Sequence, residues 1–156
     1  MGIDDIIDHV RGLGGVLVLA PQPADGSPEI AWGDVFFYYA PDGAVPRTQP
    51  FATVVTKDYP DDTRSRLDRP GAFRVNIAAG ATEFRRWIGR APRDAGAEDL
   101  DPATPDVVMP HPVYGHLGWL AVVEPGPRTD VAVRDLLRTA HGFAMARAER
   151  RPDTSA

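Results

Sequence analysis

The 156-residue chain lacks cysteine altogether. This absence excludes a disulfide framework, a thiolate nucleophile and thiolate metal ligands, while it says little about the redox compartment. Lysine is nearly absent too, because Lys57 is the only lysine beside 16 arginines. Any Schiff base or lysine–phosphate contact would therefore rest on Lys57, although a lysine that ends a strand is usually solvated.

Long apolar runs are also missing, and no run approaches the length that crosses a membrane. The first fifteen residues, MGIDDIIDHVRGLGG, are acidic with scattered apolar positions, unlike the basic start and continuous apolar region of a signal peptide. We therefore expect a soluble, cytoplasmic protein without a membrane partner. The chain length suits one domain that buries about 70% of the surface of its unfolded form.

Several functional signatures are absent as well. The chain has no GxxxxGK[ST] loop and no G-x-S-x-G elbow, and the glycines at 12, 14 and 15 precede an expected strand instead of opening a helix. No cofactor is predicted on these grounds.

The net charge is −5, and basic residues alternate with acidic ones, as in residues 61–69 (DDTRSRLDR). Binding to nucleic acid is unlikely on this evidence, since it generally requires a continuous basic face.

The apolar pattern predicts a helix, several strands, a short helix, further strands and a long final helix. Strands that follow one another closely in sequence usually pair antiparallel. We therefore predict an α+β fold in one domain, residues 1–150, with a mostly antiparallel sheet flanked by N-terminal and C-terminal helices. The expected strands are 16–20, 29–40 (one strand or a bent pair with a bulge at Gly33), 51–57, 73–78, 107–109 and 118–124.

The expected helices begin at residue 3, after Thr82 as a cap, and after Thr129 as a cap. Helical spacing predicts that Phe84, Trp87 and Ile88 point inward from the second helix. In the final helix, the predicted buried face carries Val133, Leu136, Leu137, Ala140, Phe143 and Ala144. Residues 89–106 show no apolar periodicity, so we expect them to form a long surface loop. We expect residues 151–156 to form a disordered tail.

Three segments carry a resemblance: PEIAWGD-FFYYAPDG, TKDYPDDTRSRLDRPG and HPVYG-LGW. On these segments the chain resembles a bacterial family of uncharacterised domains, over nearly all of residues 3–150. Its second half is also similar to the MmcQ/YjbR-like proteins, through FRVNI, the short helix with Trp87, HPVYGHLGW and the final helix. This second resemblance implies an antiparallel sheet flanked by two helices, and an association with DNA that has been suggested for that group. Neither resemblance implies an established reaction.

The stretch MPHPVYGHLGW, residues 109–119, contains two of the four histidines. Prolines on both sides of His111 restrict it to extended geometry, so the stretch predicts a shaped loop that enters a strand. One interpretation is architectural, with Tyr114 and Trp119 covering the sheet and the histidines bonded to local backbone. Another is catalytic, with His111 and His116 as acid and base and Tyr114 as a donor to an oxyanion.

A metal site is the weakest interpretation of the two histidines. Their His-x4-His spacing has no cysteine and no fixed third ligand, and Asp106 or His141 would serve only if the fold brought them near. No metal ligand is therefore predicted.

A second candidate group lies on the strands. Alternation places Arg74 and Asn76 on one face of the strand FRVNI, and separates Phe36 and Tyr38 from the rings at 37 and 39. One interpretation is that helices and the long loop cover both faces of the sheet. The other is an aromatic-lined concavity that binds a small molecule. The ligand-binding residues under that hypothesis are Trp32, Tyr38, Lys57, Arg74, Asn76 and Trp119.

Three functions remain open at this stage. The best prediction is a protein that binds or transforms a small-molecule ligand, such as a specialised metabolite, near the loop of residues 111–116. The alternatives are a non-catalytic module that binds another protein, and a DNA-associated domain that the acidic charge disfavours. The oligomeric state is not predicted.

Overall fold

The computed structural model describes residues 1–94, 96 and 100–150, so the predicted tail of residues 151–156 and positions 95 and 97–99 lie outside the described residues. The described residues form three α-helices, two short 3-10 turns and one six-stranded sheet. In chain order the elements are α1 (Ile3–Arg11), β1 (Val16–Leu19), η1 (Glu29–Ala31), β2 (Val35–Tyr39), β3 (Ala52–Val55), β4 (Arg74–Ala78), α2 (Gly80–Ile88), β5 (Met109–Pro110), η2 (Gly115–Leu117), β6 (Trp119–Val123) and α3 (Asp130–Arg150).

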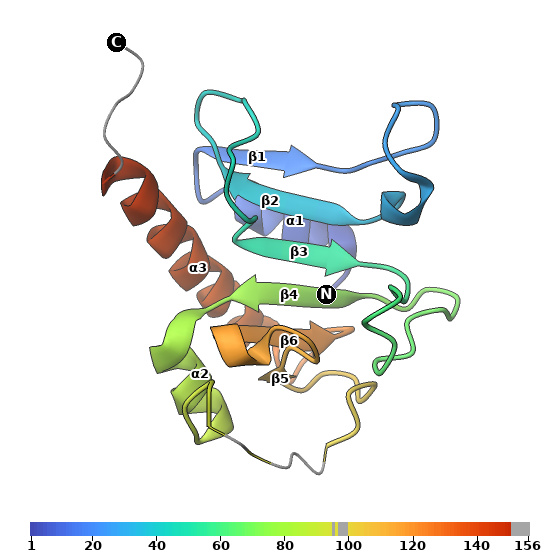
Figure 1. Cartoon of the computed structure of the whole chain (residues 1–156), viewed down its shortest axis with the longest axis vertical. Coiled ribbons are helices and arrows are strands. Elements are labelled where there is room, and N and C mark those ends of the chain that lie inside the picture. The colour runs from blue at the N-terminus through green and yellow to red at the C-terminus, as the bar shows by residue number, and fades with distance from the viewer. Residues whose placement is uncertain (95, 97–99, 151–156) are drawn as a thin grey trace.

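The strands are ordered β1-β2-β3-β4-β6-β5, and every neighbouring pair is antiparallel (Figure 1). The α+β prediction with terminal helices is therefore confirmed. The first four strands follow chain order, since each connects to its neighbour. The last two are exchanged, because the chain passes through α2 and the following loop before β5 and then returns as β6 between β5 and β4.

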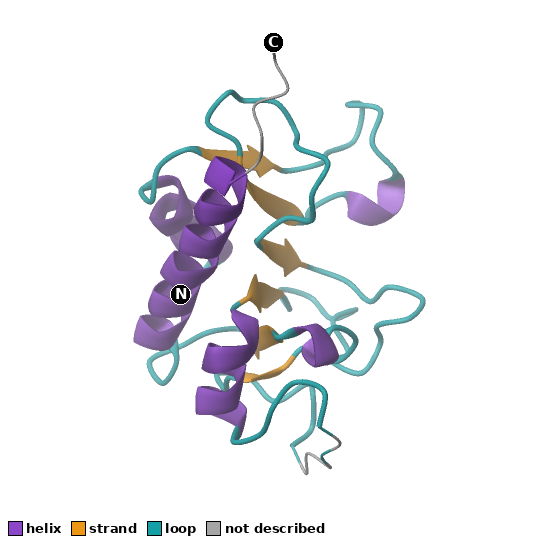
Figure 2. Ribbon diagram, turned by 60° about the vertical axis from the view of Figure 1, so that its left-hand side comes forward, coloured by secondary structure: helices purple, strands orange, loops and turns teal. Residues whose placement is uncertain are grey.

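The two faces of the sheet differ in what covers them. Helices α1 and α3 lie side by side against one face, while loops and the two 3-10 turns lie on the other side (Figure 2). Strand alternation sends Val75 and Ile77 toward the helices, where Ile6, Val10 and Leu137 complete a core without solvent exposure. The opposite face carries the alternate residues of the same strands, and it holds the cavity described below.

Residues 29–40 do not form the predicted strand or bent pair. Residues Glu29–Ala31 form a 3-10 turn, and the strand begins only at Val35. The intervening Gly33 has φ +87°, and its N–H donates to Pro21 O. Gly33 thus belongs to the turn that enters β2 and not to a bulge inside a strand.

The starts of the two later helices also differ from the prediction. Helix α2 begins at Gly80 with Ala79 before it, so Thr82 is inside the helix and does not cap it. Helix α3 begins directly after Thr129 as expected, but the Thr129 hydroxyl donates to Asp106. Asp106 also accepts the N–H groups of Gly126, Arg128 and Thr129. This carboxylate from a distant loop serves the helix start, and no local sequence pattern indicates it.

Two aromatic side chains expected in the core are exposed. Trp87 of α2 and Phe143 of α3 are 42% and 43% accessible to solvent, whereas Phe84 and Leu136 on the same helices are buried. Helical spacing assigns a face about 100° wide, and residues at its margin fall on either side of the boundary.

Among the described residues, no helix is long and apolar enough to cross a membrane.

Candidate functional site

A cavity of about 530 Å³ opens on the face of the sheet that the helices do not cover. Its floor comes from four neighbouring strands, β2, β3, β4 and β6, and its rim from η1, from the segment after β3 and from the loop before β6. The floor residues are Phe36, Tyr38, Thr53, Val55, Arg74, Asn76 and Trp119. Because side chains alternate along a strand, the floor residues within β2, β3 and β4 are spaced two apart.

Strand register aligns the floor into rows. Phe36 is paired with Thr53, and Thr53 with Asn76, across three adjacent strands. Asn76 Nδ2 donates to Thr53 Oγ1 at 3.0 Å, so the polar row is tied together across the sheet. The floor is therefore aromatic at the β2 end and polar at β4.

Arg74 is the polar centre of the site, and it has no solvent exposure. Its guanidinium forms a bidentate ion pair with Asp62, and Nη1 also donates to Ser65 Oγ at 2.9 Å. Its Nε donates to Asn76 Oδ1 at 2.7 Å. A buried guanidinium is costly unless it is paired and hydrogen-bonded, and these contacts meet that requirement.

Asp62 is held as a carboxylate by this arrangement. Burial alone would raise the pKa of Asp62, but the hydrogen bonds and charge of Arg74 outweigh burial and lower that pKa below its usual value. The pair therefore has nearly zero net charge. The guanidinium is fixed in place and keeps donor capacity on the side of His111.

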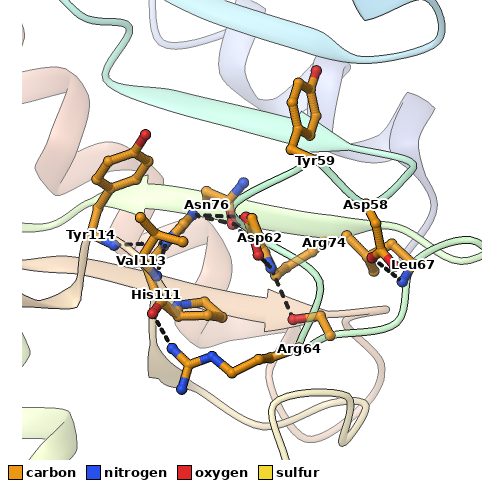
Figure 3. Close-up of polar contacts among 12 residues, drawn as sticks. Asp58, Tyr59, Asp62, Arg64, Leu67, Arg74, Asn76, His111, Val113 and Tyr114 are labelled. Atoms are coloured by element: carbon orange, nitrogen blue, oxygen red, sulfur yellow. Dashed lines mark hydrogen bonds and ion pairs between the residues drawn. The ribbon is translucent and has the colours of Figure 1, made fainter. Parts of the chain in front are cut away.

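His111 lies beside Arg74 (Figure 3). Only 5% of this histidine is exposed. Its Nδ1 accepts the backbone N–H groups of Val113 and Tyr114, each at 3.0 Å. Its Nε2 lies 3.2 Å from Arg74 Nη2. The loop conformation that the flanking prolines favour thus turns the following backbone onto the ring.

His111 is uncharged near neutral pH. Burial, followed by the positive charge of Arg74, lowers the pKa of His111 to about 3. The Asp62 carboxylate raises that pKa by less than the other two effects lower it. A ring in this state is a poor general base at neutral pH, because it resists taking a second proton.

The rim of the cavity carries exposed apolar side chains. Ile30, Tyr114 and Leu117 line the cavity and are 43%, 45% and 57% accessible to solvent. The Tyr114 ring also packs on His111, with 5.0 Å between ring centroids. Apolar groups concentrated around a cavity mouth are typical of surfaces that contact a ligand or a partner.

The structure brings six of the predicted site residues to this cavity: Tyr38, Arg74, Asn76, His111, Tyr114 and Trp119. Trp32, Lys57 and His116 are not among the described residues that line it. Lys57 donates to Asp34 and to Trp32 O, and Trp32 Nε1 donates to Ser27 O, so both side chains serve the fold around η1. Asp34, with no exposure, also accepts from Tyr59 and Thr56.

His116 lines a different cavity, of about 480 Å³, on the other side of the loop. His111 reaches both cavities, but the two histidines do not share the floor of the aromatic one. His141 contacts Gly14 O and the rings of Tyr39 and Phe51. Within the described part of the chain, no group of three or more His, Asp or Glu side chains is arranged to hold a metal ion.

Asp62, Thr53 and Tyr59 were missed from the sequence, and all three line the cavity. Asp62 lies in a polar segment that looks like a solvated turn. A buried arginine requires a carboxylate, so the prediction that Arg74 lines a concavity could have prompted a search for one. It could not have selected Asp62 among the 22 acidic residues.

Comparison with known proteins places the chain in a family without assigning it an activity. The model of a family of unknown function, DUF6194, matches residues 1–153. The chain therefore belongs to that family. No curated protein and no solved structure matches it.

Proposed function

We propose that this DUF6194 protein binds a small molecule with a flat, apolar body in the cavity on the helix-free face of the sheet. The observation that carries the proposal is the cavity itself, of about 530 Å³, lined by aromatic rings and a few converging polar groups. Ligand sites in proteins have this size and this mixture of mostly apolar walls and few polar groups. A specialised metabolite with an aromatic ring system fits that description.

Acid and base catalysis by a histidine pair is not part of the proposal. His111 has a pKa of about 3 and its Nδ1 already accepts two backbone N–H groups. His116 lines the other cavity. The groups that face the aromatic floor are therefore suited to binding and orientation more than to proton transfer.

A thermal-shift screen with flat aromatic compounds tests the proposal. Compounds that bind the native state raise the melting temperature, and the rise grows with the logarithm of the ligand concentration relative to its Kd. Tyr38→Ala removes a ring from the floor and should abolish the shift. Trp87→Ala removes an exposed ring on α2 that does not line the cavity, and should retain it. No shift with any compound, or equal loss in both variants, would reject the proposal.

A second candidate, a protein-binding module, is favoured by the exposed rim residues Ile30, Tyr114 and Leu117. Under this alternative the flat compounds would bind no better to wild type than to Tyr38→Ala. The resemblance to MmcQ/YjbR-like proteins, a bacterial origin and a cytoplasmic location stay predictions. DNA association is the least favoured of the three functions because the net charge is −5.

A further inference from the structure

Two hydrogen-bond donors meet at the polar end of the cavity. Arg74 Nη2 and His111 Nε2 lie 3.2 Å apart, and both side chains line the cavity. A guanidinium nitrogen has hydrogens and no acceptor capacity. The contact is a hydrogen bond only if the histidine nitrogen accepts.

The tautomer of His111 decides that question. Two backbone N–H groups donate to Nδ1, so Nδ1 carries no hydrogen. A neutral imidazole has one protonated nitrogen, and here that nitrogen must be Nε2. Nε2 is therefore a donor, and it points its hydrogen into the same region as Arg74 Nη2.

The described residues offer this Nε2–H no acceptor within hydrogen-bond distance. Asp62 Oδ2 is 4.0 Å from Nε2, and that oxygen already accepts from Arg74 Nη2. Because only 5% of His111 is exposed, bulk water does not solvate its N–H freely. A buried donor without an acceptor is destabilising, so an acceptor from outside the chain would be favoured here.

We infer that the ligand presents an unprotonated sp² oxygen, from a carbonyl or a carboxylate, to His111 Nε2 and Arg74 Nη2 together. This inference rests on the proposed function, since it names the polar group of the same ligand. One oxygen can lie about 2.9 Å from both nitrogens when they are 3.2 Å apart. The apolar body then extends over the aromatic floor of Phe36 and Tyr38.

The charges at the site suit both kinds of oxygen. Asp62 neutralises Arg74, so a neutral carbonyl can bind without leaving an unpaired charge. A carboxylate would gain more from the guanidinium but would lie near the Asp62 and Asp61 carboxylates that also line the cavity. The shared requirement is an oxygen that accepts two hydrogen bonds at one point.

Three probes test the inference on the wild-type protein: 2-acetylnaphthalene, 2-isopropenylnaphthalene and 2-naphthoate. The first two have nearly the same shape, and differ in that a C=O of the ketone is a C=CH₂ in the alkene. Dissociation constants are measured by titration, with the ¹H–¹⁵N signal of His111 Nε2–H followed by NMR. Since the comparison uses unmodified protein, it does not depend on a variant that folds.

We expect the ketone, the carboxylate or both to bind about tenfold or more tightly than the alkene, because a hydrogen bond from a charged donor such as the Arg74 guanidinium is worth at least that ratio. The same compounds should shift the Nε2–H signal downfield. The tighter of the two oxygen compounds identifies the source of the oxygen. Equal affinity of the alkene and both oxygen compounds would overturn the inference and leave the proposed function standing. No binding by any of the three would overturn both.

Discussion

His111 Nε2 lies 3.2 Å from Arg74 Nη2, although both of these atoms are hydrogen-bond donors. The guanidinium nitrogen always donates, and the backbone N–H groups that Nδ1 accepts leave the ring proton on Nε2. The arrangement follows from two separate structural requirements. Arg74 is fixed by its ion pair with Asp62, and His111 is fixed by the turn of the chain at residues 113 and 114. Neither side chain can turn away from the other without losing those partners.

The first prediction concerns the proton on His111. Long-range ¹H–¹⁵N NMR of the imidazoles should show the Nε2–H tautomer for His111, and this ring should stay uncharged down to about pH 4 because burial and Arg74 lower its pKa to about 3. The His111→Phe protein assigns the signal. Detection of an Nδ1–H form would contradict the geometry of the loop.

The second prediction is a dependence of stability on pH. The unfolded ring has a pKa near 6.5 and the folded ring about 3, so between these values the unfolded state binds more protons. The contribution of His111 to the free energy of unfolding should be complete above pH 6.5. It should fall as the pH decreases toward 3, by at most about 1.4 kcal/mol per pH unit.

Urea denaturation at pH 7, 6, 5 and 4.5 measures this slope. The free energy of unfolding of His111→Phe should change less with pH over this range than that of wild type, whatever the stability of the variant at pH 7. His116→Phe is the matched control. Because His111 is unchanged in this variant, the pH dependence that His111 causes should be retained. Identical slopes for wild type and His111→Phe would show that His111 does not cause the dependence.

The third prediction separates the buried ion pair from an exposed one. Asp62→Asn leaves the unexposed guanidinium of Arg74 without its counter-charge, and should lower the free energy of unfolding by about 3–5 kcal/mol. Asp101→Asn makes the same chemical change in an exposed ion pair with Arg66. The side chain of Arg66 is 61% exposed and that of Asp101 is 52% exposed. Denaturant titration should show a far smaller loss for Asp101→Asn than for Asp62→Asn, because an exposed ion pair is screened by solvent. Similar losses in the two variants would refute the central role of Arg74.

The fourth prediction concerns Gly118, which ends η2 and leads into β6 with φ +89°. A Cβ at this position would lie 3.1 Å from the backbone carbon of Gly80. Gly26 has a similar φ of +84°, but its Cβ would meet nothing within 4 Å. Both Gly→Ala variants should incur the backbone cost of about 1–2 kcal/mol. In Gly118→Ala the free energy of unfolding should fall by about 1–3 kcal/mol more, because the start of α2 must move away from the added Cβ. Equal melting temperatures would mean that this contact adapts freely.

Much of the fold was predictable because its signals are local. The alternation in FRVNI placed Arg74 and Asn76 on one face of the strand. Two of the errors occurred where a distant group replaced a local one. Asp106 serves the start of α3 in a role that the sequence assigned to the Thr129 hydroxyl, and Lys57 is held by Asp34 across the entry to β2.

By itself the sequence determined the α+β class, the alternating faces of the strands and the shared face of Arg74 and Asn76, because these depend on periods of two and 3.6 residues. Only the tertiary structure decided that one face of the sheet holds a cavity, that Asp62 pairs with Arg74, and that His111 and His116 face different cavities. The contacts of Arg74 with Asp62 and with His111 join residues 12 and 37 positions apart in the chain. They depend on how the whole chain packs, which no local period records.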